Sequence, residues 1–179
     1  MKKTFCIILT LIFLLLTHTA CKNNSTYENA NSTHQWDGSV ASSFEGGSGT
    51  KSDPYKIADA SQLAFLAKSV NEGTSYSGKY VVLTEDIDLN NVEWTPIGNG
   101  IQVFMGNFDG KEHTVKNLKI SQSIHYTYEY PTGLKAPYCD MGLFATVQDA
   151  TIQNMVIDGA TITIIDTKST YTHRVGVLC

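Results

Sequence analysis

The alternation of apolar and polar positions predicts one helix near residue 60. Four apolar residues recur at the spacing of one helical face: Leu63, Leu66, Ala67 and Val70. Asp59 stands just before this stretch and Gln62 follows three positions later, which is the pattern of an N-terminal capping box. Gly73 supplies a stop signal. The pattern predicts an amphipathic helix over 60–71 that packs through its apolar face.

Elsewhere the apolar residues fall into short runs that are typical of β-strands. The predicted strands are 55–57, 80–83, 87–89, 103–105, 114–115, 118–120, 142–144, 151–152, 155–157 and 161–165. No second helical pattern occurs between them. Many short strands without intervening helices predict an all-β architecture.

Two pairs of segments repeat along the chain. Residues 114–120 read TVKNLKI and 151–157 read TIQNMVI, with first residues 37 positions apart, and 141–144 match 175–178. Residues 121–138 are rich in Tyr and Pro and look like a loop inserted between the copies. In a β-solenoid, equivalent strands of successive coils stack, so aliphatic positions recur. Two hairpin turns in a β-sandwich remain the alternative interpretation.

An Asn lies at the same position in both copies of the longer repeat, Asn117 and Asn154, between two short aliphatic pairs. Asn tolerates unusual backbone angles and can bond to backbone groups at a bend. We expect both residues to form corners, and stacked copies of this Asn could bond to each other between coils.

The first twenty residues have the pattern of an export signal. Two lysines precede an apolar run that is too short for a comfortable transmembrane helix. The small residue Ala20 stands before Cys21, which resembles the cleavage and lipidation site of a bacterial lipoprotein. His18 departs from that pattern and leaves cleavage without an anchor as the alternative. Residues 1–20 are therefore predicted to be a signal peptide, with a lipid on Cys21 holding the protein on a membrane.

Residues 21–35 are polar and poor in aliphatic side chains, as in a flexible tether. The folded domain is predicted to cover 36–179. These features predict a location at the outer membrane or cell surface, although a face toward the periplasm remains open.

Charge and cysteine usage narrow the possible partners. The formal net charge is −4, and removal of Lys2 and Lys3 with the signal would bring it near −6. A mildly acidic chain with dispersed lysines argues against nucleic acid as a partner. Once Cys6 has left with the signal and Cys21 is acylated, Cys139 and Cys179 remain. They either pair in an oxidising compartment or stay as thiols.

Motifs of catalytic machinery are absent from the sequence. It holds no HExxH, GxSxG, P-loop or GxGxxG, so no catalytic residue and no cofactor are assigned. Asp86 and Asp88 lie two apart at a predicted corner and are weak candidates for a calcium site, with solvated carboxylates as the alternative. Trp36 and Trp94 are expected in the core.

Four tyrosines in the inserted segment are the candidate ligand-binding residues: Tyr126, Tyr128, Tyr130 and Tyr138. Exposed tyrosines on a loop can stack on sugars or anchor a protein partner. Packing of these side chains against the flank of the solenoid is an equally open alternative.

A series of short motifs from residue 36 onward resembles the surface proteins with GLUG motifs that are common in gut Bacteroidetes. The motifs are Trp36-Asp37-Gly38-Ser39, Asp53-Pro54-Tyr55-Lys56-Ile57, Gln62-Leu63-Ala64-Phe65-Leu66, Leu83-Thr84-Glu85-Asp86-Ile87-Asp88-Leu89, Trp94-Thr95-Pro96-Ile97-Gly98, Phe108-Asp109-Gly110, His113-Thr114-Val115 and Gly142-Leu143-Phe144. The resemblance implies a right-handed parallel β-helix whose first coil is closed by the helix over 60–71. It also implies further coils, so the domain is expected to be incomplete at its C-terminus.

Three functions stay open at this stage. The first is a non-catalytic envelope module for adhesion, which binds a host or dietary glycan or a matrix protein. The second is a β-helix enzyme that processes polysaccharides, which needs a cluster of acids and bases that the sequence does not present. The third is a structural stalk of a longer protein whose active domain lies elsewhere.

Overall fold

A computed structural model describes residues 35–123, 127–129, 135–137, 140–165 and 174–178. The chain divides into two units, Met1–His34 and Gln35–Cys179. The signal segment, Cys21 and the tether up to residue 34 lie outside the described residues, as do Cys139 and Cys179. The account that follows concerns the second unit alone.

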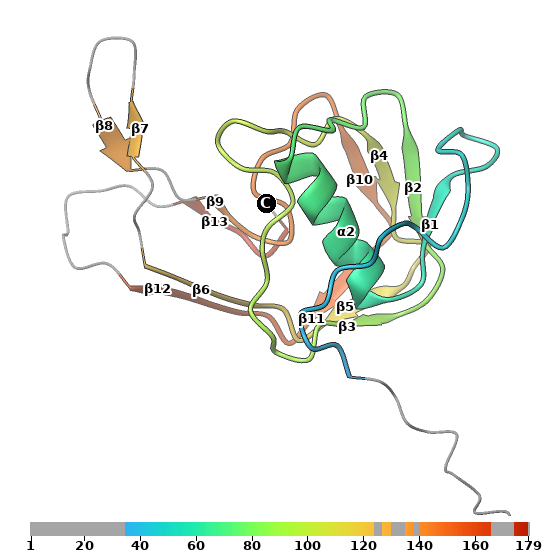
Figure 1. The fold of residues 1–179 in the computed structure, drawn as a ribbon. Coiled ribbons are helices and arrows are strands. Elements are labelled where there is room, and N and C mark those ends of the chain that lie inside the picture. The colour runs from blue at the N-terminus through green and yellow to red at the C-terminus, as the bar shows by residue number, and fades with distance from the viewer. Residues whose placement is uncertain (1–34, 124–126, 130–134, 138–139, 166–173, 179) are drawn as a thin grey trace, which may run out of the picture. The chain divides into compact units, whose positions relative to one another are not determined.

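The described part of the chain is all-β apart from one helix, and most of its strands are parallel. The first sheet has the order β1-β2-β4-β10, and Figure 1 shows these strands side by side. The second sheet has the order β11-β5-β3, and two further sheets pair β6 with β12 and β9 with β13. The bounds are β1 Tyr55–Ile57, β2 Tyr80–Leu83, β3 Ile87–Asp88, β4 Asn107–Asp109, β5 Thr114–Lys116, β6 Lys119–Ser123, β9 Asp140–Met141, β10 Thr151–Gln153, β11 Val156–Asp158, β12 Thr161–Ile165 and β13 Arg174–Val175.

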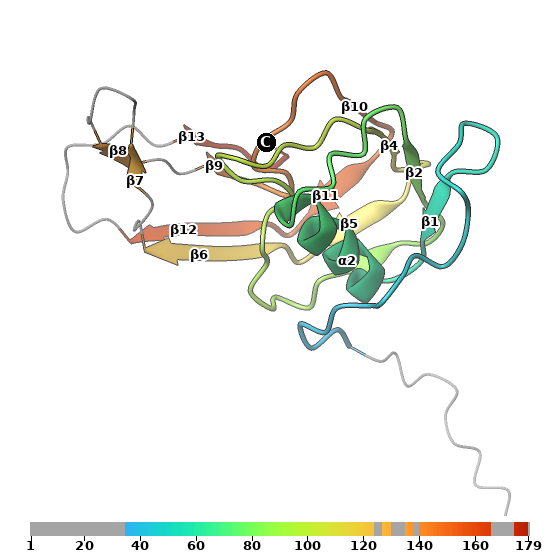
Figure 2. The same ribbon diagram turned by 45° about the horizontal axis from the view of Figure 1, so that its top comes forward.

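The chain visits these sheets in a constant order. It runs β4, β5, β6 and β9, and then repeats the route as β10, β11, β12 and β13, each strand parallel to its counterpart. An earlier pass follows the same route through β2 and β3, and then through single bridges from Glu93 to Lys119 and from Ile97 to Phe144. Figure 2 shows the long strands β6 and β12 running together along one side.

Aliphatic and aromatic side chains stack between successive passes and form the core. Val81 lies beside Phe108, which lies beside Ile152, and Ile87, Val115 and Ile157 form an equivalent row. The members of both rows in the first two passes are fully buried. Ile152 and Ile157, in the last pass, are only partly buried against the same core. The row pattern follows from parallel pairing, which places counterparts directly above one another.

The helix α2, Ala60–Asn71, confirms the predicted helix and its start. The Asp59 carboxylate accepts the backbone N–H of Gln62 at 2.9 Å, and the Gln62 side chain accepts the N–H of Ala58 at 2.8 Å. At the C-terminal end, Gly73 adopts φ +110° and the N–H of Thr74 donates to Ser69 O at 2.9 Å. This is the Schellman arrangement that ends a helix at a glycine. The buried face of α2 packs on the core beside β1 (Figure 1).

The longer sequence repeat does not mark stacked strands. The prediction that 114–120 and 151–157 stack on each other in successive coils was therefore wrong. The 114–116 strand pairs with Val156–Asp158, and the 151–153 strand pairs with Asn107–Asp109. The first copy forms the corner between β5 and β6, and the second forms the corner between β10 and β11. They are therefore neighbouring types of corner and not equivalent positions of two passes. The shorter match is correct, because Met141 pairs with Val175 and Leu143 N–H donates to Val177 O at 3.0 Å.

Both repeat asparagines form corners, as predicted, but they do not bond to each other. Asn117 and Asn154 have φ of 57° and 53°, in the left-handed region that Asn tolerates. The Asn117 amide donates to Asp88 Oδ1 at 2.8 Å, and the Asn154 amide donates to Asp109 Oδ1 at 3.1 Å. Each corner is therefore tied to the preceding pass by an Asp–Asn bond.

Most predicted strands are present, with three differences. The runs 103–105 and 142–144 contribute only single bridges, from Phe104 to Val147 and from Phe144 to Ile97. Asn107–Asp109, in contrast, forms a strand that the apolar pattern did not indicate. Within the predicted inserted loop, β6 extends to Ser123, and β7, Thr127–Glu129, pairs antiparallel with β8, Lys135–Pro137. The helix in the described residues, α2, has 12 residues and falls well short of a transmembrane span.

Candidate binding site

The tyrosines predicted to bind a ligand fall largely outside the described residues. Tyr126, Tyr130 and Tyr138 lie in segments that the structure does not describe. Tyr128 lies on β7, where its backbone is opposite Ala136 of β8. The cluster therefore stays a prediction.

Asp86, one of the two weak metal candidates, is bonded to the following pass. Its Oδ1 accepts the N–H of Thr114 at 2.9 Å and lies 3.4 Å from His113 Nδ1, and its Oδ2 lies 3.3 Å from Lys116 Nζ. The Thr114 N–H and the Lys116 ammonium lower the pKa of this carboxyl below its usual value. The geometry makes Asp86 a link between β3 and β5.

Asp88, the second candidate, serves the corner beside β3. Its Oδ1 accepts the N–H of Asn90 at 2.7 Å as well as the Asn117 amide. Among the described residues, no group of three His, Cys, Asp or Glu side chains is placed to hold a metal ion.

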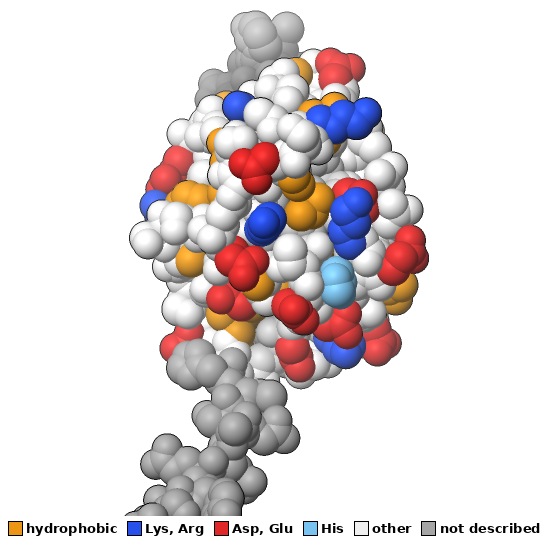
Figure 3. Space-filling view, turned by 90° about the vertical axis from the view of Figure 1, so that its right-hand side faces the viewer, with side chains coloured by type: hydrophobic (Ala, Val, Ile, Leu, Met, Phe, Trp, Pro, Cys, Tyr) orange, Lys and Arg blue, Asp and Glu red, His pale blue; other side chains and the backbone are white. Residues whose placement is uncertain are grey.

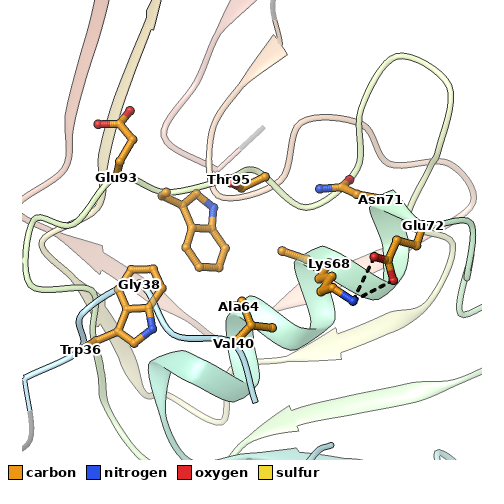
Figure 4. A pocket seen from close by; sticks show the side chains of 11 residues that line it. Trp36, Gly38, Val40, Ala64, Lys68, Asn71, Glu72, Glu93 and Thr95 are labelled. Atoms are coloured by element: carbon orange, nitrogen blue, oxygen red, sulfur yellow. Dashed lines mark hydrogen bonds and ion pairs between the residues drawn. The ribbon is translucent and has the colours of Figure 1, made fainter. Parts of the chain in front are cut away.

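A pocket of about 330 Å³ lies between α2, residues 36–40 and residues 93–95, which follow β3 (Figure 4). Its lining combines an apolar floor with a charged and polar rim. The lining residues are Trp36, Gly38, Val40, Ala64, Ala67, Lys68, Asn71, Glu72, Glu93, Trp94 and Thr95. In Figure 4, Ala64, Lys68 and Asn71 line it from the helix, and Thr95 lies on the opposite strip of chain. A concave site with an apolar floor and a few polar groups is the usual form of a small-ligand site.

Two tryptophans are fixed in the floor of this pocket. The ring centroids of Trp36 and Trp94 are 5.9 Å apart, with an interplanar angle of 57°. Trp36 Nε1 donates to Ser39 O at 2.8 Å, and Trp94 Nε1 donates to Leu143 O at 3.2 Å. Because both indole N–H groups are bonded to the backbone, the rings are held in place at the base of the pocket, where little of their surface is exposed.

The tryptophans were predicted to be core residues, and they are: Trp36 is 7% exposed and Trp94 is 3% exposed. Their role in the floor of a pocket was missed. No spacing in the sequence relates residue 36 to residue 94, because the fold alone brings them together with one face of α2.

The rim of the pocket has charges of both signs. Lys68 Nζ lies 2.9 Å from Glu72 Oε1 on the exposed side of α2. The carboxylate of Glu93 is turned away from the pocket (Figure 4), where it accepts the N–H of Ser121 and lies 4.0 Å from Lys119 Nζ. Only the stem of Glu93 therefore faces the pocket, and the charges at the rim itself balance.

Asn71 closes the pocket at the last turn of α2. Its amide nitrogen donates to Pro96 O at 3.0 Å, which fixes the side chain. Its Oδ1 is shielded from bulk water and has no donor among the described residues. A buried acceptor without a partner costs about 1–3 kcal/mol, so this corner of the lining is polar and incompletely satisfied.

Charges elsewhere on the described surface are also mixed. The face in Figure 3 shows acidic and basic side chains interspersed, with apolar atoms between them. This face therefore offers no continuous field of one sign for a highly charged partner.

Comparison with known proteins adds one distant relative. The chain is 28% identical over 140 residues to a protein of Evansella cellulosilytica named "Putative Gly-rich membrane protein". The match covers 74% of this chain and 14% of that protein. No family model matches the chain, and no solved structure matches it.

Proposed function

We propose that the protein is a non-catalytic, lipid-anchored binding module of the cell envelope. Its folded part is a parallel β-helix of the GLUG type, whose first coil is closed by α2. The ligand, a glycan or a protein, binds in the pocket beside α2. The pocket with its two fixed tryptophans is the observation that carries the proposal, because it is a preformed concave site on a rigid scaffold.

The route of the chain supports a β-helix. Successive passes cross four sheets in the same order and pair in parallel register. A sandwich of hairpins would instead give mainly antiparallel neighbours. In the described part, antiparallel pairing is confined to β7 with β8 and to the Gly46–Lys56 bridge.

The roles of the acidic residues support a binding function over catalysis. Asp86, Asp88 and Asp109 each accept a backbone N–H group. Each also bonds to the following pass, Asp86 through the Thr114 N–H and the other two through the amides of Asn117 and Asn154. Carboxylates that are occupied in this way serve the corners of the fold. A catalytic pair would need to face a shared substrate space.

Anchoring through Cys21 accounts for a membrane location that needs no spanning helix among the described residues. A diacylglycerol together with an N-acyl chain holds a protein firmly on a bilayer. The name of the Evansella cellulosilytica relative agrees with a membrane location.

The anchor can be tested by expressing the full chain and its Cys21→Ser variant in a Gram-negative host. We expect the parent to enter the membrane fraction and take up labelled palmitate, and the variant to lose both. Equal membrane recovery of the two proteins, without label, would refute the anchor.

The binding role can be tested with the full chain on arrays of glycans and matrix proteins. The variant Val40→Glu places a charge at the pocket, and Ile101→Glu is the matched control, because Ile101 is an exposed aliphatic residue outside the lining. We expect Val40→Glu to abolish binding and Ile101→Glu to preserve it. Equal binding by both variants would reject the pocket as the site.

A further inference from the structure

We infer that residues 36–40 form a strap that opens while the rest of the fold stays intact, and that its opening extends the pocket beside α2 to the ring of Trp94. The pocket described above is then the closed form of the site. This inference goes beyond the proposed binding function, because it concerns a movement of the chain that needs no ligand. Three features carry it: the attachment of the strap, the empty space beneath it and the different anchoring of the two tryptophans.

The strap is attached to the fold through Trp36. Within the strap this side chain alone is buried, and the other residues are exposed. Its ring lies 5.9 Å from that of Trp94, and its carbonyl oxygen accepts the Asn90 amide at 3.0 Å. Directly after the strap the chain is fastened again, because the N–H of Ala41 donates to Ser61 O on α2 at 3.0 Å. Release of Trp36 would therefore free the strap, with Ala41 as its hinge.

Two hydrogen bonds lie within the strap and do not attach it to the rest of the fold. The Ser39 N–H donates to Asp37 Oδ1 at 3.0 Å, and Trp36 Nε1 donates to Ser39 O at 2.8 Å. Both bonds join residues two or three apart in the sequence. They shape the strap as a local turn, so its release does not require them to be exchanged for bonds elsewhere in the fold.

Empty space separates part of the strap from the helix that it crosses (Figure 1). The pocket of about 330 Å³ has Gly38 and Val40 of the strap on one side and Ala64 and Ala67 of α2 on another. Residues that line a void have fewer contacts to lose than residues in a close-packed core. Movement of this part of the strap therefore costs little packing, and most of the cost falls on Trp36.

Trp94, in contrast, is anchored within the stacked passes. Its Nε1 donates to Leu143 O at 3.2 Å, and its backbone N–H donates to Lys119 O at 2.8 Å. Opening of the strap would remove Trp36 and leave Trp94 in place, so the side of the Trp94 ring that Trp36 covers would become accessible. A ligand that needs this surface would bind the open form alone, and its apparent affinity would fall in proportion to the open fraction.

The two indole N–H groups provide a direct test, because the sequence contains no other tryptophan. Their exchange with deuterated water would be followed by NMR in the full chain, in detergent and without ligand, at urea concentrations below unfolding. We expect the Trp36 indole to exchange about 100-fold faster than that of Trp94, with little dependence on urea, since a local opening exposes little surface. Exchange of the Trp94 indole should require global unfolding, which urea promotes strongly.

Two variants separate local opening from global unfolding. Asn90→Gly removes the bond to Trp36 O and should speed exchange of the Trp36 indole about fivefold. Asn91→Gly is its matched control, because Asn90 and Asn91 have similar left-handed backbones, with φ of 51° and 54°, and it should leave this rate unchanged. Gly110→Ala forces two passes apart, so it should speed exchange of the Trp94 indole about fivefold or more without affecting that of Trp36.

Three outcomes would overturn the inference. Equal exchange of both indoles with the same urea dependence, or equal acceleration of both by Gly110→Ala, would mean that the strap leaves only when the whole domain unfolds. A Trp36 rate that Asn90→Gly does not change would mean that this indole exchanges without release of the strap. Because no ligand is present, these results are independent of the binding arrays, and a failure of the proposed function would leave them unaffected.

Discussion

At the scale of single residues, the corners of the fold depend on carboxylates that accept backbone N–H groups. Asp109 accepts the N–H of Lys111 at 3.0 Å, lies 3.0 Å from the Lys111 ammonium and accepts the Asn154 amide. Partial burial alone would raise the pKa of Asp109, but these bonds outweigh it and lower the pKa to about 2. The ionised form therefore stabilises the folded state.

The pH dependence of Asp109 follows from this shift. Because its pKa is lower in the folded state, its contribution is complete above the unfolded value of 3.8 and is lost as the pH falls toward 2. By linkage, Asp109→Asn should cost about 2 kcal/mol at pH 7, and this difference should shrink by about 1 kcal/mol at pH 3. Urea unfolding at both pH values measures it, with Asp158→Asn, an exposed carboxylate of β11, as the control. A cost that does not change with pH would contradict this role.

Close approach of two passes makes Gly110 another sensitive residue. A Cβ at this position would lie 2.3 Å from Met155 Cβ and 2.5 Å from Asn154 O. Because a backbone atom is involved, Gly110→Ala should lower the free energy of unfolding by about 1–3 kcal/mol. At Gly46 a Cβ meets nothing within 4 Å, so Gly46→Ala should change it by less than about 0.5 kcal/mol. Equal effects in urea unfolding would show that the passes can move apart.

At the scale of elements, α2 was predictable because its signals are local. The capping pair, the apolar stripe and the terminal glycine all lie between Asp59 and Gly73. Each of these signals acts within a few residues, so neighbours in the sequence suffice to define the helix.

The pairing of the strands was not predictable in the same way. The segments 114–120 and 151–157 are alike because both contain a strand, a left-handed Asn and a second strand. That likeness defines a type of corner and does not say which pass the corner belongs to. Asn107–Asp109 was missed as a strand because only Phe108 is apolar, and its partners in β2 and β10 are distant in sequence.

The same reasoning explains which part of the site the sequence could indicate. Composition can suggest a binding loop, but the tyrosines of the inserted segment stay a prediction, because most of them lie outside the described residues. A pocket made of residues 36, 64–72 and 93–95 exists only once α2 and the strip after β3 lie side by side. The sequence predicts its tryptophans as core residues, and most of their surface is indeed buried. Nothing in the sequence shows that they also line a pocket.

The cap of α2 gives a prediction at this scale. Asp59→Ala removes the acceptor of the Gln62 N–H and should lower the free energy of unfolding by about 1 kcal/mol. Asp59→Asn keeps a capping oxygen and should stay within a few tenths of a kcal/mol of the parent. Thermal and urea unfolding of the two variants measure the difference. If alanine and asparagine destabilise the protein equally, the cap contributes through charge and not through the hydrogen bond.

At the scale of the folded unit, the two ends of the first sheet differ. The outer edge of β1 is covered, because Gly46 and Lys56 form an antiparallel bridge and α2 packs beside it. At the other end β10 is the last strand, and within the described residues no strand pairs with its outer edge. Ile152 and Ile157, which end the two rows of core residues on this side, are correspondingly only partly buried. Unpaired edges of this kind readily accept another strand.

Hydrogen exchange of the protein in dilute solution should reveal this asymmetry. Amides of β4 and β5, which have a parallel neighbour on both sides, should exchange far more slowly than those of β10 and β11. The edge strand β1 serves as the internal control, because the bridge from Lys56 N–H to Gly46 O, at 3.0 Å, should slow the Lys56 amide. Exchange measured by mass spectrometry over peptides that separate these strands gives the comparison. Protection of β10 and β11 equal to that of β4 and β5 would mean that another segment or molecule covers this edge. Protection that then falls on dilution would identify a second molecule as the cover, since only binding between molecules depends on concentration.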